Sequence, residues 1–149
     1  MRWNVLLVCL AFALLSCGRK PETLEEYQDR VVTFPNGKQV RAEPLVTASE
    51  MERGMMFRDS IAPDRGMLFF HSTPGKYKYW MFQCRIPLDI IWMDGNRRIV
   101  EISANTPPCT GARDTCPTFG GNFDALYVLE LGGGMAAKYE LKVGDTLKF

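Results

Sequence analysis

Two carboxylates of this chain are embedded in strongly apolar segments. Asp89 lies within residues 86–93, and Glu130 lies within residues 125–131. A carboxylate buried among apolar side chains costs several kcal/mol unless an ion pair or hydrogen bonds compensate for it. Asp89 is the leading candidate for a functional residue, because it is the single acid in the three apolar segments found between residues 65 and 93.

Asp89 has a structural and a functional interpretation. In the structural one, its charge is compensated by backbone hydrogen bonds or by an ion pair with Arg58 or Arg65, which lie at the ends of elements beside the apolar strands. Arginine suits this role because its planar guanidinium donates two parallel hydrogen bonds to a carboxylate. In the functional one, Asp89, both arginines, Trp80 and Gln83 form the wall of a pocket for a polar ligand. An aromatic face beside an amide and a carboxylate is suited to a sugar or a similar polyol.

A hydrolase is the enzymatic alternative. Two strand carboxylates can act as acid and base at a glycosidic bond when they lie about 5 to 10 Å apart, and this would pair Asp89 with Glu130. Because most acids in such strands face solvent, we expect Glu130 at the surface and treat the pair as a minor hypothesis. The single histidine, His71, lies in a predicted loop near the surface, so the sequence offers no Ser/His/Asp or Cys/His set.

Methionine is frequent in and around the apolar segments. Six methionines lie there: Met51, Met55, Met56, Met67, Met81 and Met93. Their thioethers could bind a soft metal such as copper. Their mixture with Phe, Leu and Ile instead favours adaptable packing of a core. We therefore expect neither a metal site nor a cofactor.

The N-terminus has the features of a bacterial lipoprotein signal. Arg2 precedes an apolar run at residues 5–15 that is too short to span a bilayer. Cys17 follows a leucine three places before it and a serine directly before it, which resembles a lipobox. Residues 1–16 are therefore predicted to be a signal peptide that is cleaved before a lipidated Cys17. An ordinary secretory peptide is the alternative.

These features predict a protein that is lipid-anchored in the cell envelope and faces the periplasm. Two or three acyl chains on one residue hold a protein durably at a membrane. Residues 17–29 form the lipidated cysteine and a charged tether, and residues 30–149 are long enough for a single domain with a real core. Removal of Arg2 with the signal leaves 17 basic and 17 acidic residues. No basic field therefore favours nucleic acid as a partner.

The cysteines predict one disulfide. Cys9 leaves with the signal and Cys17 is lipidated, so three cysteines remain in an oxidising compartment. Cys109 and Cys116 lie in a loop rich in Pro, Gly and Thr, and we expect them to form a disulfide that stabilises the domain by about 2.5 kcal/mol. A metal site is the alternative, but the spacing fits no common zinc pattern. Cys84 lies among bulky apolar residues and is expected to be a buried, inert thiol.

Apolar alternation and turn residues predict a mainly β domain. A hairpin is expected around Asn36 and Gly37. A capping-box sequence from Thr47 to Glu50 predicts a short helix to about Phe57. Strands are expected at residues 30–34, 39–43, 66–70, 78–82, 86–93, 97–103, 125–131 and 146–149, a loop at 71–77, and a helical turn at 135–139. The expected architecture is a single-domain β-sandwich or partly open β-barrel with two short helices.

Three long collinear segments resemble a known family. They are ERGMMFRDSIAPDRGMLFFH, YWMFQCRIPLDIIWMDGNRRIVEI and YVLELGGGMAAKYELKVGD, and the similarity runs from Val31 to Phe149. In these three segments the chain resembles the bacterial and archaeal family catalogued as domain of unknown function 192. The resemblance implies a compact β-rich fold that is often exported or lipid-anchored, and it implies no activity.

The chain departs from the family pattern beside Asp89. The family usually has tryptophan, methionine, lysine, asparagine and threonine before proline-leucine-aspartate, whereas this chain has Gln83 and Cys84 in the last two of those positions. Gln83 keeps an amide, but Cys84 lacks the hydroxyl. If that pair carries chemistry in relatives, this member lacks part of it; if it satisfies buried backbone groups, little changes. The cysteine pair at 109 and 116 is a second departure.

Together these features favour a non-catalytic module that binds a small polar ligand, for example a carbohydrate, or another protein of the envelope. The candidate ligand-binding residues are Arg58, Arg65, Trp80, Gln83 and Asp89. The two alternatives are the hydrolase described above and a purely structural envelope protein.

Overall fold

The computed structural model describes residues 29–149. The predicted signal peptide, the lipidation site at Cys17 and all of the tether except Asp29 lie outside the described residues. In the described part of the chain, no helix is both long and apolar enough to cross a membrane.

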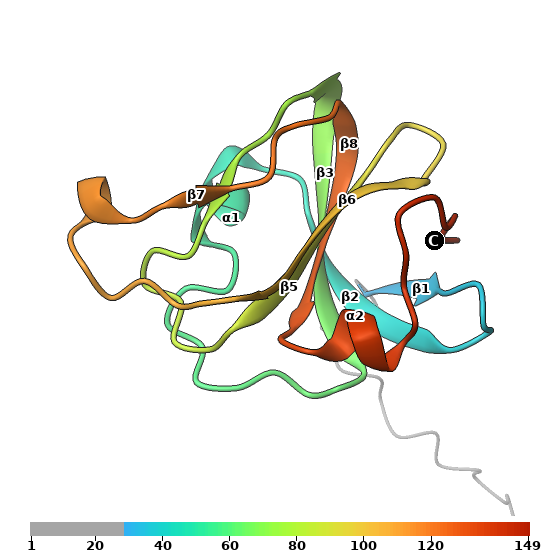
Figure 1. The fold of residues 1–149 in the computed structure, drawn as a ribbon, viewed down its shortest axis with the longest axis horizontal. Helices are drawn as coiled ribbons and strands as arrows, with labels where there is room; N and C mark the ends of the chain where they lie inside the picture. The colour runs from blue at the N-terminus through green and yellow to red at the C-terminus, as the bar shows by residue number, and fades with distance from the viewer. Residues whose placement is uncertain (1–28) are drawn as a thin grey trace, which may run out of the picture.

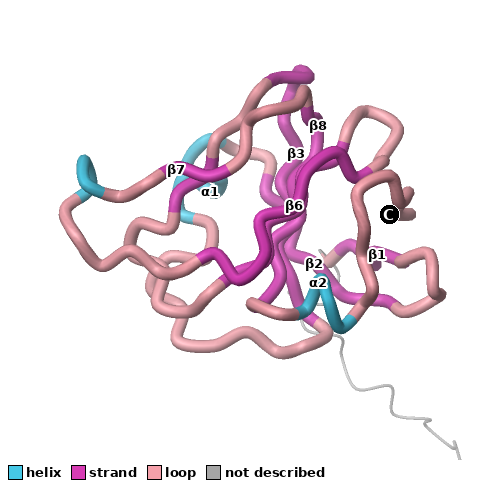
Figure 2. The backbone as a smooth tube through the Cα atoms, in the orientation of Figure 1, coloured by secondary structure: helices cyan, strands magenta, loops and turns pink. Residues whose placement is uncertain are grey.

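A six-stranded mixed sheet forms the centre of the domain (Figure 1). Across the sheet its strands follow the order β1 (Arg30–Thr33), β2 (Gln39–Leu45), β3 (Arg65–Gly75), β8 (Ala125–Gly132), β5 (Leu88–Met93) and β6 (Ile99–Thr106). β2 and β3 pair in parallel, and the other neighbours pair antiparallel. A second sheet consists of two short strands, β4 (Tyr79–Trp80) and β7 (Thr118–Phe119), and loops surround it (Figure 2).

The predicted hairpin and the predicted capping box are both present. Gly37 has a φ of 81° in the turn between β1 and β2, a conformation that glycine adopts without strain. The Thr47 side chain accepts a hydrogen bond from the Glu50 amide, and the Glu50 carboxylate accepts one from the Thr47 amide over 2.9 Å. The helix α1 (Ala48–Arg53) ends earlier than predicted, because Gly54 has a φ of 39° and leaves the helical region.

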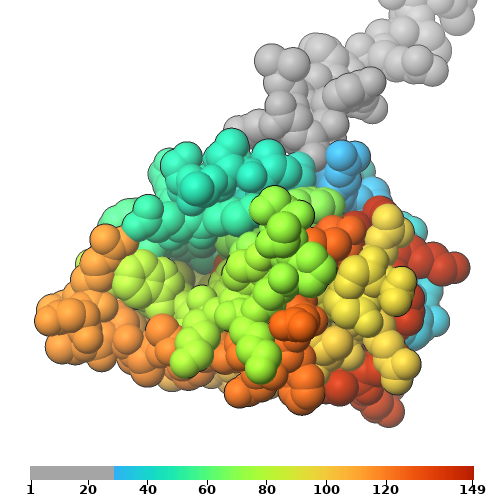
Figure 3. Space-filling model, turned by 90° about the horizontal axis from the view of Figure 1, so that it is seen from above, coloured from blue at the N-terminus to red at the C-terminus, as the bar shows by residue number. Residues whose placement is uncertain are grey.

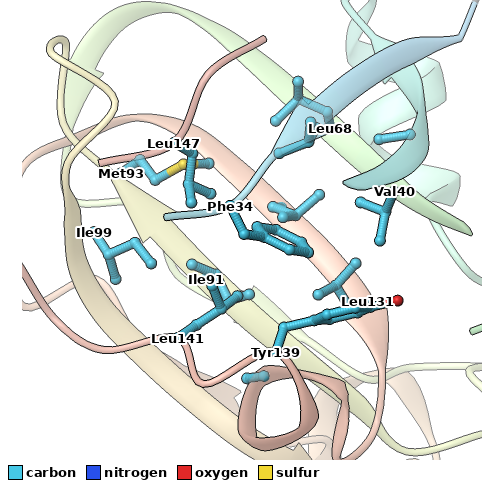
Figure 4. Close-up of a cluster of buried hydrophobic side chains, with 14 residues drawn as sticks. Phe34, Val40, Leu68, Ile91, Met93, Ile99, Leu131, Tyr139, Leu141 and Leu147 are labelled. Atoms are coloured by element: carbon cyan, nitrogen blue, oxygen red, sulfur yellow. The ribbon is translucent and has the colours of Figure 1, made fainter. Parts of the chain in front are cut away.

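The main sheet carries a buried cluster on each face, since successive strand residues point to opposite sides. One face includes Ile91, Leu129 and Leu131, and Phe34 lies near the centre of this cluster (Figure 4). The other face packs against α1 and the two-stranded sheet. Its members include Met55, Met67, Phe69, Met81, Ile90, Trp92 and Val128.

The C-terminal segment connects the two edges of the main sheet. Thr33 of β1 and Lys148 exchange backbone hydrogen bonds of 2.8 and 3.1 Å, and Arg98 and Thr146 form a bridge next to β6. The strand expected at 146–149 is therefore reduced to isolated bridges, and the barrel stays partly open. The predicted mainly β fold with two short helices, α1 and α2 (Met135–Lys138), is confirmed.

The loop predicted at residues 71–77 is wrong over residues 71–75. β3 continues to Gly75, so His71 lies in a strand and is half-buried. Its ring stacks on Tyr77 with 3.5 Å between the ring centroids, and its Nε2 lies 3.1 Å from the Tyr79 hydroxyl. These aromatic partners hold the extended backbone where the sequence showed only turn-forming residues. Burial lowers the pKa of His71.

The predicted disulfide between Cys109 and Cys116 is present. The short 3-10 helix η1 (Arg113–Thr115) lies between the two cysteines. The Cys109 amide donates to the carbonyl of Met81 over 3.0 Å, and the Gln83 amide donates to the carbonyl of Cys109 over 3.1 Å. The disulfide loop is therefore joined to the segment that follows β4.

Candidate functional site: a buried glutamate beside a charged pocket

Asp89 is fully buried, and its partners are backbone amides. Its Oδ1 accepts hydrogen bonds from the amides of Asn105 (2.7 Å) and Gly134 (3.1 Å), and its Oδ2 accepts one from Ala136 (2.6 Å). These bonds tie the end of β6 and the start of α2 to β5. Three amide donors compensate the charge without a cation. Backbone hydrogen bonding is thus the explanation that the structure supports for Asp89.

Arg58 and Arg65 pair with other acids. Arg58 donates two hydrogen bonds to the Glu43 carboxylate, of 2.8 and 2.7 Å. This bidentate contact raises the pKa of Arg58. Arg65 donates one of 2.5 Å to Asp29. The ion pair with an arginine, one of the two structural alternatives for Asp89, is therefore wrong, because both arginines pair with other acids.

Asp89 and Glu130 point to opposite faces of the main sheet. Across the antiparallel pair of β5 and β8, Asp89 lies opposite Leu131, and Ile90 lies opposite Glu130. Cross-strand partners share a face and successive residues alternate. The two carboxyls therefore cannot flank one glycosidic bond, and the hypothesis of an Asp89–Glu130 acid/base pair is wrong.

Glu130 is buried, although we expected it at the surface. It is 4% exposed, and its Oε2 has no hydrogen-bond partner among the described residues. Burial raises the pKa of the Glu130 carboxyl to about 8, so the neutral acid predominates at neutral pH. A buried acid with a perturbed pKa beside a cavity is a candidate for a functional group.

A cavity of about 30 Å³ adjoins Glu130. Such a volume holds a single water molecule or a small ion. Its lining is rich in sulfur and aromatic rings and includes Met51, Met55, Met56, Cys84, Trp80 and Phe82. Cys84 is a buried free thiol, as predicted. Burial and the nearby Glu130 raise the pKa of this thiol to about 12, which suppresses its reactivity as a nucleophile.

A larger pocket of about 600 Å³ lies between α1, β2 and the start of β3. Its lining is half charged and half apolar. The charged side chains are Asp29, Glu43, Glu50, Arg53, Arg58 and Arg65. The apolar side chains are Pro44, Leu45, Met56, Phe57 and Met67.

The acidic side chains of the large pocket already have ion-pair or hydrogen-bond partners within the protein. Glu43 and Asp29 form the ion pairs described above. Glu50 accepts hydrogen bonds from backbone amides at the start of α1, first among them that of Thr47, and these bonds lower its pKa. The Arg53 side chain has no hydrogen-bond or ion-pair partner among the described residues. Arg53 is therefore the group of this lining that can bind an anion without displacing a partner.

The segment 53–58 separates the small cavity from the large pocket. Arg53, Gly54 and Met56 line both of them. Phe57 lines the large pocket, is 51% exposed and has a φ of 65°. Its amide donates to the carbonyl of Gln83 over 2.9 Å, which holds the unusual backbone. A bulky residue in this conformation is rare, so an exposed one at a pocket deserves a functional explanation.

The other predicted site residues lie apart from the large pocket. Trp80 lines the small cavity and a further pocket of about 220 Å³ next to His71. The guanidinium of Arg113, on the disulfide loop, lies 4.8 Å from the Trp80 ring centroid. Gln83 has a φ of 56° and uses its backbone to hold neighbouring segments. Of the five predicted residues, the structure brings together Arg58 and Arg65, whereas Asp89 belongs to the opposite face.

The chain belongs to the family DUF192, described as "Uncharacterized ACR, COG1430", whose profile matches residues 31–149. A crystal structure of a protein of unknown function from Novosphingobium aromaticivorans is similar, with 33% identity and a TM-score of 0.71, over 81% of this chain and 84% of that one. A putative transcription regulator from Sinorhizobium meliloti is also similar, with 28% identity and a TM-score of 0.70, over 79% of this chain and 89% of that one. No curated protein matches the chain.

Proposed function

We propose that this domain is a non-catalytic module of the cell envelope that binds a small molecule with an apolar body and an anionic head group. The binding site is the 600 Å³ pocket between α1, β2 and β3. One observation carries the proposal: each acid of the lining already has a partner, whereas the guanidinium of Arg53 has none among residues 29–149.

Arg53 receives the head group. A carboxylate or a phosphate accepts two parallel hydrogen bonds from a guanidinium, and such charge-assisted bonds are stronger than neutral ones. Arg58 and Arg65 are held in their own ion pairs. A ligand therefore meets Arg53 as the available cation, and the paired arginines keep the surrounding charge balanced.

The apolar body lies against the other half of the lining. Leu45, Met56, Phe57 and Met67 provide an apolar surface next to the charged side chains. The volume lies within the usual range for small-molecule sites, roughly 300 to 1,000 Å³. Phe57 is held with its ring at the pocket although this costs backbone strain. Contact with an apolar ligand explains why that strain is retained.

The envelope location rests on the N-terminal sequence. A lipidated Cys17 would hold the pocket close to a membrane surface, where molecules with an apolar body and a charged head are abundant. Replacing Cys17→Ser should release the chain into the soluble fraction or block its processing. If the Cys17→Ser variant is processed and still stays in the membrane, lipid anchoring is contradicted. The binding proposal is tested separately by the ligand titration below.

Hydrocinnamate, a phenyl ring on a short chain that ends in a carboxylate, tests the pocket. We expect it to shift the backbone amide resonances of residues 53–58 in the full chain and to leave those of β6 unchanged. Arg53→Gln should weaken binding by about 10-fold or more, since a hydrogen bond to a charged group contributes about 1.5 to 3 kcal/mol. Hydrocinnamamide, the neutral amide of the same acid, cannot form the ionic contact with Arg53. Its affinity for the wild-type protein should therefore be as low as the affinity of hydrocinnamate for the Arg53→Gln variant.

Arg85→Gln is the matched control, because Arg85 is an exposed arginine that pairs with Asp59 outside the pocket. It should bind hydrocinnamate like wild type. Equal loss of affinity in both arginine variants would show a general charge effect and would contradict a site at Arg53. Absence of any shift in residues 53–58 at saturating ligand would overturn the proposal.

A further inference from the structure

The small cavity beside Glu130 has a lining unlike that of the ligand pocket. Four sulfur-bearing side chains line its 30 Å³: Met51, Met55, Met56 and Cys84. The aromatic rings of Trp80 and Phe82 line it as well. Figure 3 looks onto the face where α1 (teal) and the chain around β4 (green) lie next to each other, with the disulfide loop (orange) beside them.

An unpartnered polar atom belongs to a residue that lines this cavity. The Glu130 Oε2 is buried and lacks a hydrogen-bond partner in the described part of the chain. A Cβ atom added to Gly54, which also lines the cavity, would lie 3.7 Å from this oxygen. Buried polar groups are nearly always satisfied, so the cavity calls for an occupant.

Water suits only the polar residues of this lining, which are Glu52, Arg53, Tyr79 and Glu130. An ordered internal water makes about three hydrogen bonds to polar groups that would otherwise be unsatisfied. Among the described residues, Glu130 Oε2 is the one buried side-chain oxygen or nitrogen without a partner. The thioethers and the thiol are weak hydrogen-bonding groups. An occupant that bonds to sulfur fits the lining better.

We propose that this cavity is a binding site for the soft monovalent metal ion Cu(I), held by the thiolate of Cys84 and the thioethers of Met51, Met55 and Met56. Thiolates and thioethers select Cu(I) among the biological metals. The rings of Trp80 and Phe82 already contact the guanidinium of Arg113, so the four sulfur atoms carry the affinity. This proposal departs from our expectation, drawn from the sequence alone, that the methionines serve packing only.

Binding forms one bond and releases one proton. The S–H bond of Cys84 breaks, the S–Cu bond forms, the proton leaves to solvent, and copper stays in the +1 state. The thiolate and Cu⁺ together are neutral, which reduces the cost of burying charge. The described residues contain no group of three or more His, Cys, Asp or Glu that could hold a metal. Calcium and zinc therefore lack the oxygen or nitrogen ligands that they need.

Cys84 accounts for two features of the cavity, the unpartnered oxygen of Glu130 and the sulfur-rich lining. It is a buried free thiol that lines the cavity. A threonine hydroxyl could give Glu130 a hydrogen-bond partner but would not bind Cu(I). A cysteine removes that partner and supplies a thiol among three thioethers. The metal site is therefore expected to depend on Cys84.

Competition with bicinchoninate, a coloured Cu(I) chelator, tests the site. The protein is the full chain with Cys9→Ser and Cys17→Ser, kept anaerobic with ascorbate so that the disulfide stays closed and Cys84 is the free thiol. We expect one equivalent of Cu(I) to be withdrawn from the chelator. Cys84→Thr should lower the affinity by on the order of 100-fold and Met51→Leu by about 10-fold, since losing a ligand costs at least as much as losing a supporting group.

Met93→Leu is the matched control, because Met93 is fully buried on the opposite face of the sheet. It should bind Cu(I) like the parent protein. The Cu(I) complex should also show an X-ray absorption spectrum with a sulfur-dominated shell. Failure of the parent protein to compete, or unchanged affinity in both Cys84→Thr and Met51→Leu, would overturn the proposal. Circular dichroism of each variant checks that it is folded before titration.

Discussion

Replacing Glu130 by glutamine should remove a pH-dependent cost of folding. Burial raises the pKa of Glu130 from 4.5 to about 8 in the folded protein. Between these values the folded protein holds a proton that the unfolded chain has lost. The free energy of unfolding is therefore highest below the lower value and falls by about 1.4 kcal/mol per pH unit up to the higher one. The loss over the whole window is about 4 to 5 kcal/mol, a large part of the stability of a small domain.

Urea unfolding of wild type and Glu130→Gln across this window measures the effect. Glutamine has nearly the shape of glutamic acid and does not ionise. The unfolding free energy of the variant should therefore lack the decline with pH that Glu130 causes in the wild type. We expect the difference between the two unfolding free energies to change by about 3 kcal/mol between about pH 5 and pH 8, in favour of the variant. A constant offset from the new amide does not affect this change. Glu140→Gln, at an exposed acid, should follow wild type.

Parallel stability curves for wild type and Glu130→Gln would refute this reasoning. They would mean that the Glu130 carboxyl is ionised in the folded protein, or that solvent reaches it through the cavity. A direct pKa from carboxyl NMR of Glu130 would then lie near its ordinary value.

Three further changes test other parts of the structure. Cys84→Thr should give Glu130 a hydroxyl partner, so the pKa of Glu130 should fall and the unfolding free energy near pH 8 should rise by about 1 kcal/mol in the same urea experiments. Asp89→Asn should replace the oxygen that accepts the Ala136 amide by a donor. It should cost about 2 to 4 kcal/mol in urea unfolding without changing hydrocinnamate affinity. Serine at both disulfide positions should lower the unfolding free energy by about 2.5 kcal/mol, and an unchanged unfolding midpoint would contradict this.

The main strands, both short helices and the disulfide were predictable from the sequence, because alternation, the Asn36-Gly37 turn and the Thr47 capping box are local signals. Two features were not. The parallel pairing of β2 with β3 depends on where α1 packs, which no local pattern specifies. The extension of β3 past His71 depends on aromatic partners from Tyr77 and Tyr79.

The need of Asp89 for partners was predictable, but the identity of the partners was not. The sequence left arginines and backbone amides as alternatives, and the structure supplies amides from two segments that follow Asp89 in the chain. The burial of Glu130 was also missed, since its strand pattern allows either face to be exposed. Arg53 and Phe57 were not singled out at all. The one signal for them was their place in the ERGMMFR segment that carries the family resemblance.

A crystal structure of the chain with bound hydrocinnamate would test the proposed binding function. We predict the carboxylate on the guanidinium of Arg53 and the phenyl ring against Phe57 and Met56, with the ion pairs of Arg58 and Arg65 intact. A ligand bound elsewhere, or bound in this pocket with its carboxylate turned away from Arg53, would contradict the proposal.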